Sequence, residues 1–446
     1  MKRREFVKNA AAITAGSIVL PYILPSGRLF ARSNAPKAGH MVMVMFGGGL
    51  RQQDSILQRY LADSQDFNVE GNILYNMLEG AAPSAKIAYG TTPSGQPSGS
   101  QPIPRILSQT LQKQGTIFAE MRAISGGHYG GLNSLVTGSR VEGQGLKVRP
   151  VNPTIFEYAR RFGGYKATDT WFIGNTISNS VPLLNSSKHP DFGLRYGANF
   201  FAPNITFGSD GYAALSNAKI YHPQEELEPM YKMKNFLDNT FSVRQGDMPG
   251  IKNTDEERTR IKEFIANTFQ RQAAGQLPMP PVSGGDGYTI GYAAEVLRVF
   301  KPKLLYVNLS NIDGCHSNFT SYLQSMHRAD HALGFLWNYI QTQIPEMSGN
   351  TIMAFAPECG RNLQHNPIQD ENDWYGYDHG DANSLRVFGG MVGLNVPSNL
   401  MVGSETNPVG KVTDFALTIA DILGFKDDVK NAGMIDPESM SLFDRI

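Results

Sequence analysis

The chain has 446 residues, of which 41% are hydrophobic and 18% are charged. These proportions are typical of a globular protein and exclude a disordered chain. Lysine plus arginine and aspartate plus glutamate both number 40, so the formal net charge is zero. Because no basic run follows the first residues, a nucleic-acid-binding surface is not expected. The 2 cysteines cannot supply a disulfide framework, and the length suffices to bury a large core.

The N-terminus carries the pattern of an export signal. The adjacent Arg3 and Arg4 are set in the sequence KRREFVK, the address that the twin-arginine (Tat) translocase reads. A weakly apolar run over 10–24 follows, and it is short for a membrane span, which needs about 20 apolar residues. We therefore predict that residues 1–35 are a Tat signal and linker, with no stable membrane span. The Tat translocase is then a partner during export to the periplasm or the extracellular space. A retained signal anchor and a merely basic N-terminus are the alternatives.

The rest of the chain alternates predicted strands with predicted helices. Residues 41–46 form a continuous apolar run, as expected for a strand covered on both faces, and three glycines follow it. The other predicted strands are 116–121, 171–174, 303–309, 351–356 and 385–388, and the predicted helices are 106–114, 154–161, 254–274, 319–342 and 414–423. This order predicts an α/β domain over residues 36–446 with a mostly parallel central sheet and helices on both faces. Residues 177–295 are aromatic and irregular, which indicates an insertion or cap.

Three polar clusters lie beside predicted strands. Asp313 and His316 follow one strand, Glu358 and Arg361 follow the next, and His379 stands shortly before the last. Sites in open α/β sheets lie at the carboxyl ends of the strands, so these clusters are expected at one edge. Carboxylate plus imidazole from neighbouring loops is the ligand set that zinc, iron and manganese prefer. The pattern therefore predicts a divalent metal site, with zinc preferred and manganese, iron or calcium as alternatives.

Several stretches resemble the alkaline phosphatase and sulfatase superfamily, in particular a Tat-exported branch of it. Residues 42–51 read VMVMFGGGLR and are similar to an opening strand that ends in Asp-Gly-hydrophobic-Arg. Residues 113–174, which include HYGGLNSLVTGSR, are similar to the block that carries the nucleophile. Residues 305–390 resemble the metal-binding block, and TDFALTIADILGF resembles the closing helix. The resemblance covers roughly half of the chain and leaves out the predicted insertion.

The resemblance implies two metal ions on either side of a nucleophile. One ion takes an Asp, a His and a later His, and these positions match Asp313, His316 and His379 in this sequence. This first ligand set is therefore expected to be intact. The resemblance further implies an alkaline-phosphatase-like fold and the hydrolysis of anionic esters.

The remaining positions depart from the superfamily pattern. At the second ion, Gly48 stands in place of an Asp, and Glu358-Cys359 stands in place of an Asp-His pair. Counting back ten residues from Gly138 places His128 where a Ser, Thr or Cys nucleophile belongs. This loss removes the covalent route. His128 could be phosphorylated, bind metal or act as acid or base, or it could rebuild a second metal site with Glu358 and Cys359.

We therefore expect an exported, metal-binding, hydrolase-like protein that acts on phosphate or sulfate esters by metal-activated water. His128 is one candidate catalytic residue. Arg361 is the other, because a guanidinium binds an anion bidentately, although it could equally pair with Asp378. The candidate metal ligands are Asp313, His316, His379 and Glu358. The alternative is a non-catalytic superfamily descendant, a periplasmic or surface binding protein for an anionic small molecule, a glycan or a partner protein.

One predicted helix carries further titratable residues. His327 and His331 have the four-residue spacing of a zinc pair, but no other ligand is indicated there, so a polar helix face is favoured. Asp330 lies between them and has two open interpretations. It could orient a metal-bound histidine from outside the ligand set, or it could be a solvated carboxylate.

Three residues beside the site keep open alternatives. Asp54 could replace the missing Asp, or it could form a turn or cap. Cys315 and Cys359 each lie inside a polar cluster, and an oxidising compartment would allow a disulfide between them. They could instead be metal thiolates or inert, small apolar residues.

Overall fold

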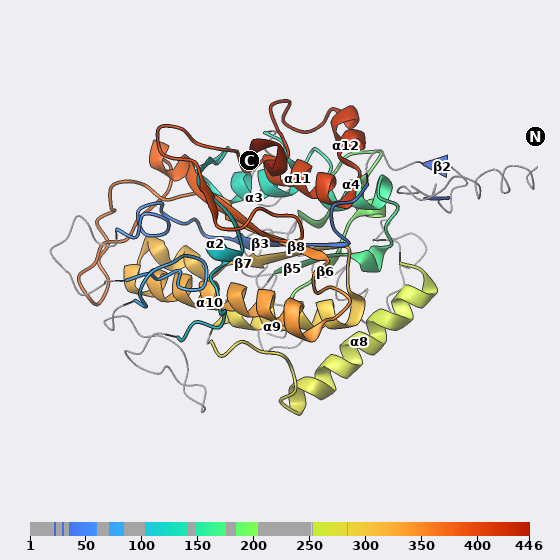
Figure 1. The fold of residues 1–446 in the computed structure, drawn as a ribbon, viewed down its shortest axis with the longest axis horizontal. Coiled ribbons are helices and arrows are strands. Elements are labelled where there is room, and N and C mark those ends of the chain that lie inside the picture. Colours follow the sequence, from blue (N-terminus) through green and yellow to red (C-terminus); the bar gives the residue numbers. More distant parts are fainter. Residues whose placement is uncertain are drawn as a thin grey trace, which may run out of the picture.

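A computed structural model of the chain describes residues 22–23, 29–30, 35–59, 71–83, 103–140, 149–174, 184–203, 251, 253–282 and 284–446. A central sheet lies between two layers of helices (Figure 1). The twin-arginine pair and most of the predicted signal lie outside the described residues, as does a large part of the predicted insertion. Within the described ranges, no helix is long and apolar enough to cross a membrane.

The described chain contains one large sheet, which has eight strands in the order β10-β4-β9-β8-β3-β7-β5-β6. The strands are β3 (His40–Phe46), β4 (Gly115–Arg122), β5 (Thr170–Gly174), β6 (Asn199–Phe201), β7 (Leu304–Leu309), β8 (Thr351–Pro357), β9 (Arg386–Gly393) and β10 (Leu400–Val402). Strand β9 runs antiparallel to β4 and β8, and the other neighbours pair in parallel. The prediction of a mostly parallel α/β sheet is confirmed. A separate pair, β1 (Tyr22–Ile23) and β2 (Leu29–Phe30), is antiparallel.

Two apolar cores lie on the two faces of the sheet. Strand β3 shows why the apolar run in the sequence is continuous, because Val42 and Val44 pack into one core while Met43 and Met45 pack into the other. Helices α3, α4 and α11 cover one face, and α9 and α10 cover the opposite face (Figure 1). Their bounds are α3 (His128–Thr137), α4 (Ile155–Arg161), α9 (Gly285–Phe300), α10 (Phe319–Gln343) and α11 (Asp414–Leu423). This arrangement confirms the prediction of helices on both faces.

The described parts of residues 177–295 belong partly to the sheet and its cover. Strand β6 extends the sheet at its edge beside β5, and α9 packs against β7. Helix α8 (Asp255–Ala273) begins at Thr254, whose side chain and that of Glu257 form the capping box that predicts this helix. The segment therefore contributes more than a cap.

Two other predicted elements have different bounds. The helix predicted over 106–114 is confined to α2 (Leu111–Gln114), because the Asn76 side chain accepts hydrogen bonds from the backbone of Ile106 and Leu107. A contact with a residue so distant in the chain overrides the local helical pattern. Strand β9 runs on to Gly393, well beyond the predicted 385–388. The chain ends in α12 (Lys426–Ala432) and a short 3-10 turn, Leu442–Arg445.

The two histidines of α10 are buried, so the prediction that they form a polar helix face is wrong. His327 is 0% exposed and His331 is 3% exposed. The Nδ1 of His327 lies 2.8 Å from the Ile73 carbonyl oxygen, and its Nε2 accepts a hydrogen bond from the Ile103 amide at 3.1 Å. The neutral Nδ1–H tautomer satisfies both contacts. His327 therefore ties two loops to α10.

Asp330, between these histidines, is also buried and is not a solvated carboxylate. It accepts hydrogen bonds from the backbone amides of Asn76 at 2.7 Å and Met77 at 2.9 Å, and a third from the Asn76 side chain. Burial raises the pKa of Asp330 to about 7, although these hydrogen bonds act in the opposite direction. None of its hydrogen-bond partners is a histidine, and its contacts hold the loop over 74–78 on α10.

We expect His327→Gln to make the stability of the protein less dependent on pH. Burial lowers the pKa of His327 to about 4, whereas an exposed histidine in the unfolded chain titrates near 6.5. As the pH falls between these values, unfolding takes up a proton at His327, and each pH unit removes about 1.4 kcal/mol of stability. In His327→Gln, the slope of unfolding free energy against pH should be smaller by the contribution of one proton, about 1.4 kcal/mol per pH unit. Urea unfolding at a series of pH values from 4.5 to 6.5 measures this slope.

His365→Gln is the matched control for this experiment, because His365 is exposed and lies outside α10. The other titrating groups are common to all three proteins, so they cancel when the slopes are compared. Equal slopes for the wild type and His327→Gln would contradict a buried neutral His327.

Candidate functional site

The predicted polar clusters meet at one edge of the sheet, where β3, β7 and β8 end beside the start of α3. Asp313 and His316 lie on η4 (Asn311–His316), a 3-10 turn that follows β7. The buried carboxylate of Asp286 fixes the start of this turn by accepting a hydrogen bond from the Ser310 amide at 2.8 Å and another from the Asn311 amide. The sheet and this turn thus place the η4 side chains beside the loops after β3 and β8.

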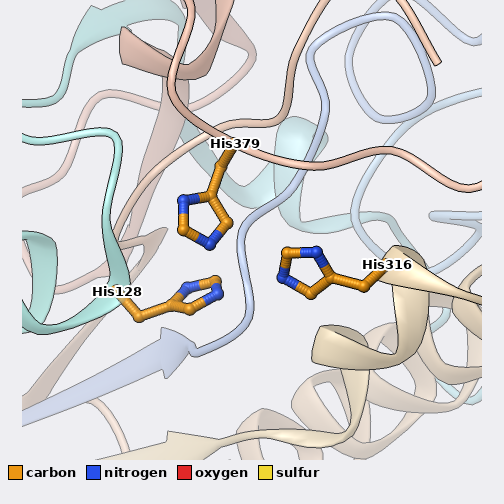
Figure 2. A group of neighbouring side chains, drawn as sticks. All are labelled: His128, His316 and His379. Carbon is orange, nitrogen blue, oxygen red and sulfur yellow. The ribbon is translucent and has the colours of Figure 1, made fainter. Parts of the chain in front are cut away.

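Three imidazoles from three different elements converge at this edge. His128 begins α3, His316 ends η4, and His379 lies in the loop before η5 (Ala382–Leu385). Their ring centroids are 4.3 Å apart for His128 and His379, 5.1 Å for His316 and His379, and 6.1 Å for His128 and His316. One nitrogen of each ring lies within 4.8 Å of one nitrogen of the other two. Figure 2 shows the three rings close together, and their nitrogens are near enough to one another to hold a metal ion.

His128 lies between two carboxylates. Its Nδ1 is 2.8 Å from Oε1 of Glu358, and its Nε2 is 2.9 Å from Oδ1 of Asp313. Burial by itself lowers the pKa of His128, but the contacts with Asp313, Cys359 and Glu358 raise it to about 12. An ion that binds Nε2 must therefore displace a proton, so metal affinity at this residue depends on pH.

The carboxylate of Asp313 connects the imidazoles to a buried arginine. Its Oδ1 lies 3.0 Å from Nη2 of Arg361 and 3.5 Å from Nε2 of His316. Burial raises the pKa of Asp313, but the hydrogen bond and charge of His128 and the charges of Arg361 and His316 outweigh it and hold the pKa well below its usual range. Asp313 is therefore an anion at neutral pH, as a metal ligand must be.

Arg361 is fully buried and connects the surrounding loops. Its guanidinium donates to the Gly49 carbonyl at 3.3 Å, to the Tyr377 carbonyl at 3.0 Å and to the Gly48 carbonyl. Its acidic partner is Asp313 and not Asp378, the pairing that the sequence left open. All three guanidinium nitrogens thus donate to groups of the protein itself, while the role of Arg361 in holding an anionic substrate stays a prediction.

His316 is oriented by a carboxylate that the sequence did not identify in this role. Its Nδ1 lies 2.7 Å from Oδ1 of Asp378. The Asn366 side chain donates to the same Asp378 oxygen at 3.2 Å and to the His316 carbonyl at 2.8 Å. Fixing Nδ1 in this way presents Nε2 of His316 to the site. The sequence gives one indication of this role for Asp378, because Asp378 directly precedes His379. Nothing in the sequence indicates the contacts of Asn366.

His379 completes the group of imidazoles. It is half-buried, and burial lowers its pKa, as do the positive charges of His128, Arg361 and His316, so the pKa is about 4. His379 is therefore neutral at pH 7. A neutral imidazole is the form that binds a metal ion.

A second group of possible ligands shares His128. The Glu358 carboxylate is fully buried and accepts a hydrogen bond from the Gly48 amide at 2.7 Å, and Sγ of Cys359 lies 3.7 Å from Nδ1 of His128. One ligand atom from each of His128, Glu358 and Cys359 lies within 4.8 Å of the others. Both Cys315 and Cys359 are free thiols in the structure. Burial raises the pKa of Cys315 to about 12 and that of Cys359 to about 11.

Gly48 occupies the position where the superfamily pattern has an Asp. Its φ is +116°, and a Cβ atom built there would collide with the backbone nitrogen of Asp313. The loop after β3 therefore has no room for a carboxylate at this position. Asp54 does not fill the gap, because it forms a buried salt bridge with Arg51 at 3.2 Å.

We expect Gly48→Ala to destabilise the protein strongly. The added methyl group meets backbone and not a flexible side chain, and the positive φ disfavours any residue with a Cβ. The expected loss is about 3 kcal/mol or more in the free energy of unfolding, measured by denaturant titration. Gly433→Ala is the control, because Gly433 has a φ of +68° but no heavy atom within 4 Å of its added Cβ. Equal losses in the two variants would show that Asp313 does not restrict position 48.

No family model matches this sequence, and no curated protein matches it. Solved structures do resemble it. Ps i-CgsB is 11% identical, with 91% of this chain and 76% of that chain covered, at a TM-score of 0.46. A protein in the alkaline phosphatase superfamily from Vibrio parahaemolyticus is 11% identical, with coverage of 95% and 76%, at a TM-score of 0.39.

The phosphonate monoester hydrolase of Agrobacterium radiobacter is also 11% identical, with 87% of this chain and 74% of that chain covered, at a TM-score of 0.40. At these identities and TM-scores, the likeness says nothing about the chemistry of the site, which rests on this chain's own side chains. One of these structures is described as a protein in the alkaline phosphatase superfamily, the group that the sequence motifs of this chain resemble.

Proposed function

We propose that this protein is an exported, metal-dependent, hydrolase-like protein that acts on phosphate or sulfate esters. The observation that supports this most strongly is the convergence of His128, His316 and His379, with one nitrogen of each within 4.8 Å of the others. The anionic Asp313 adjoins two of these imidazoles. We propose these four side chains as the ligands of one divalent ion.

The donor set fits a transition metal. Three imidazole nitrogens and one carboxylate oxygen suit zinc, and they also suit iron or manganese. Calcium prefers an all-oxygen site, so the three histidines disfavour it. A divalent ion held here would supply Lewis-acid catalysis and lower the pKa of water to about 7.

The chain around the ligands is arranged to receive an anion. His128 is the first residue of α3, and the N-cap, Gly127, has no side chain that could occupy the end of the helix. The amides and the dipole at a helix N-terminus favour a negatively charged group. We propose that the ester oxygens lie here. In this proposal Arg361 acts by holding Asp313 and the adjacent loops.

The position of His128 also bears on the reaction type. It stands where the superfamily pattern has the attacking hydroxyl or thiol, and an imidazole held by Glu358 and facing Asp313 is placed to bind an ion. We therefore propose a direct attack by water without a covalent serine or threonine ester. The same substitution favours the alternative of a non-catalytic binding protein for an anionic ligand.

The decisive experiment starts from protein purified after export. Metal analysis should find a divalent ion, and a panel of phosphomonoesters, phosphodiesters and sulfate esters should show slow turnover that a chelator abolishes. No turnover with the metal fully bound would favour the binding protein.

Export is tested by replacing Arg3 and Arg4 with lysine, after which the precursor should remain in the cytoplasm.

A further inference from the structure

We propose that Glu358 is a positioning residue, which holds Nδ1 of His128 so that Nε2 faces His316 and His379. On this inference the His128–Glu358–Cys359 group is not a second metal site, despite its spacing. The inference deepens the proposed function and rests on it for its functional meaning. The contact itself is a property of the chain alone.

The distance between the two side chains favours a direct hydrogen bond. Oε1 of Glu358 lies 2.8 Å from Nδ1 of His128, the usual distance for an N–H group and a carboxylate. The Nε2 of His128, in contrast, has no well-aligned hydrogen-bond partner among the residues that the structure describes. Nδ1 is therefore the nitrogen that the carboxylate holds, and Nε2 is the nitrogen left for an ion.

Glu358 is itself held in place by the backbone. Its Oε1 accepts a second hydrogen bond from the Gly48 amide at 2.7 Å. Gly48 has little freedom to move, because its Cα packs against the backbone of Asp313 too closely to admit a Cβ. The backbone of the β3 loop thus fixes the carboxylate, and the carboxylate fixes the imidazole.

The other oxygen of Glu358 suggests that stability does not explain this residue. Oε2 is buried, and it has no hydrogen-bond partner among the residues that the structure describes. A buried polar atom without a partner costs free energy, so an apolar side chain would suit this position better for folding alone. The contact of Oε1 with His128 gives a reason for a carboxylate here.

The same arrangement recurs on the opposite side of the site. Asp378 lies 2.7 Å from Nδ1 of His316, as Glu358 lies 2.8 Å from Nδ1 of His128. In both cases Nε2 turns toward Asp313, at 3.5 Å for His316 and 2.9 Å for His128. Histidine ligands of metal ions commonly donate their other N–H to a carboxylate, which fixes the ring and strengthens the ligand. Two imidazoles arranged in this way point to one shared ion.

Glu358→Ala and Glu358→Gln together test the inference. Zinc is titrated into each exported protein, with the number of bound ions and the Kd as readouts. We expect one ion per chain in every protein. Loss of such a partner typically weakens metal binding by about 10- to 100-fold, so Glu358→Ala should show a loss of this size. The amide oxygen of Glu358→Gln can still accept from Nδ1–H, so its Kd should stay within about threefold of wild type.

A second readout does not involve metal. Nitrogen-15 NMR of the histidine rings should show a slowly exchanging Nδ1–H proton on His128 in the wild type and in Glu358→Gln, and it should be lost in Glu358→Ala. Asp378→Ala is the matched control, because it should weaken zinc binding through His316 and leave the His128 resonance unchanged. A mainly structural role for Glu358 would lower thermal stability in both Glu358 variants without separating them in Kd.

Several outcomes would overturn the inference. One is that the wild type binds two zinc ions and both Glu358 variants lose one of them. Another is that Glu358→Ala and Glu358→Gln weaken zinc binding equally. The third is that the His128 ring of the wild type lacks the Nδ1–H resonance. Failure of the proposed function looks different. A chain that binds no zinc, yet shows the Glu358-dependent resonance, would remove the metal centre and leave the positioning contact in place.

Discussion

Replacing His316 by alanine is expected to remove most of the bound divalent metal. His316 lies on η4, and Asp378 binds its Nδ1 and so orients its Nε2 toward the proposed ion. Elemental analysis of protein purified after export should find about one ion per chain in the wild type and a small fraction of that in His316→Ala. The result does not depend on whether the protein is a catalyst.

The same substitution should reduce the stabilisation that metal provides. An ion that binds only the folded chain adds about 2.7 kcal/mol at a concentration 100 times its Kd, and this gain disappears when the site is lost. Zinc should therefore raise the Tm of the wild type and have little effect on His316→Ala. His365→Ala is the control, since His365 is an exposed histidine outside the group of converging imidazoles. Equal metal content in the wild type and His316→Ala would refute the assignment.

Much of the fold could be predicted because local pattern and tertiary environment agree. The apolar run of β3 is continuous because the strand is covered on both faces, and the capping box at Thr254 predicts the start of α8. The helix expected over 106–114 failed for the opposite reason. Its backbone donors bond to Asn76, a partner that no local pattern identifies.

The sequence likewise predicted some features of the candidate site and not others. The short spacing of Asp313 and His316 on one loop, and the resemblance that led to His128 and His379, select the residues that converge. The sequence could not indicate which ring nitrogen faces the site, because that depends on Asp378 and Glu358. The burial of His327 also depends on distant loops, so the sequence of α10 did not reveal that the face with its two histidines is buried.

Gly48 shows how the two kinds of information complement each other. The superfamily pattern indicates that a carboxylate is missing there, which by itself suggests a weakened second metal site. The structure adds a physical reason, because the backbone of Asp313 fills the space that the side chain would need. The amide of Gly48 instead binds Glu358, which in turn contacts His128. The missing carboxylate at Gly48 and the histidine at position 128 are thus connected through Glu358.

His128→Ala is expected to abolish ester hydrolysis. The substitution removes an imidazole nitrogen that faces Asp313 at the start of α3 and leaves the Glu358 carboxylate buried without its histidine partner. Turnover of phosphate or sulfate esters should fall by about 100-fold or more, the usual effect of removing a catalytic acid, base or ligand. Initial rates with the ester panel, at saturating zinc, measure the change.

Ser134→Ala and Thr137→Ala are the controls, because they are the serine and the threonine of α3, the helix that His128 begins. Ser134 Oγ donates to the carbonyl oxygens of the preceding turn, and Thr137 Oγ1 donates to the Asn133 carbonyl at 2.7 Å. Both hydroxyls are thus bonded within the helix and do not approach the imidazoles. Their removal should change stability by about 1 kcal/mol and leave the rate per folded molecule unchanged.

The two substitution types separate the possible mechanisms. If water attacks the ester directly, no serine or threonine becomes modified, and rapid quenching of the reaction should recover unlabelled protein. Substrate-dependent labelling of Ser134 or Thr137 would contradict this, since it requires a hydroxyl to leave its helical hydrogen bond and reach the ester. If His128→Ala retains metal and full activity, the site at the start of α3 is not where hydrolysis occurs. If it loses metal and activity together, with Ser134→Ala unaffected, His128 acts through the ion it helps to hold.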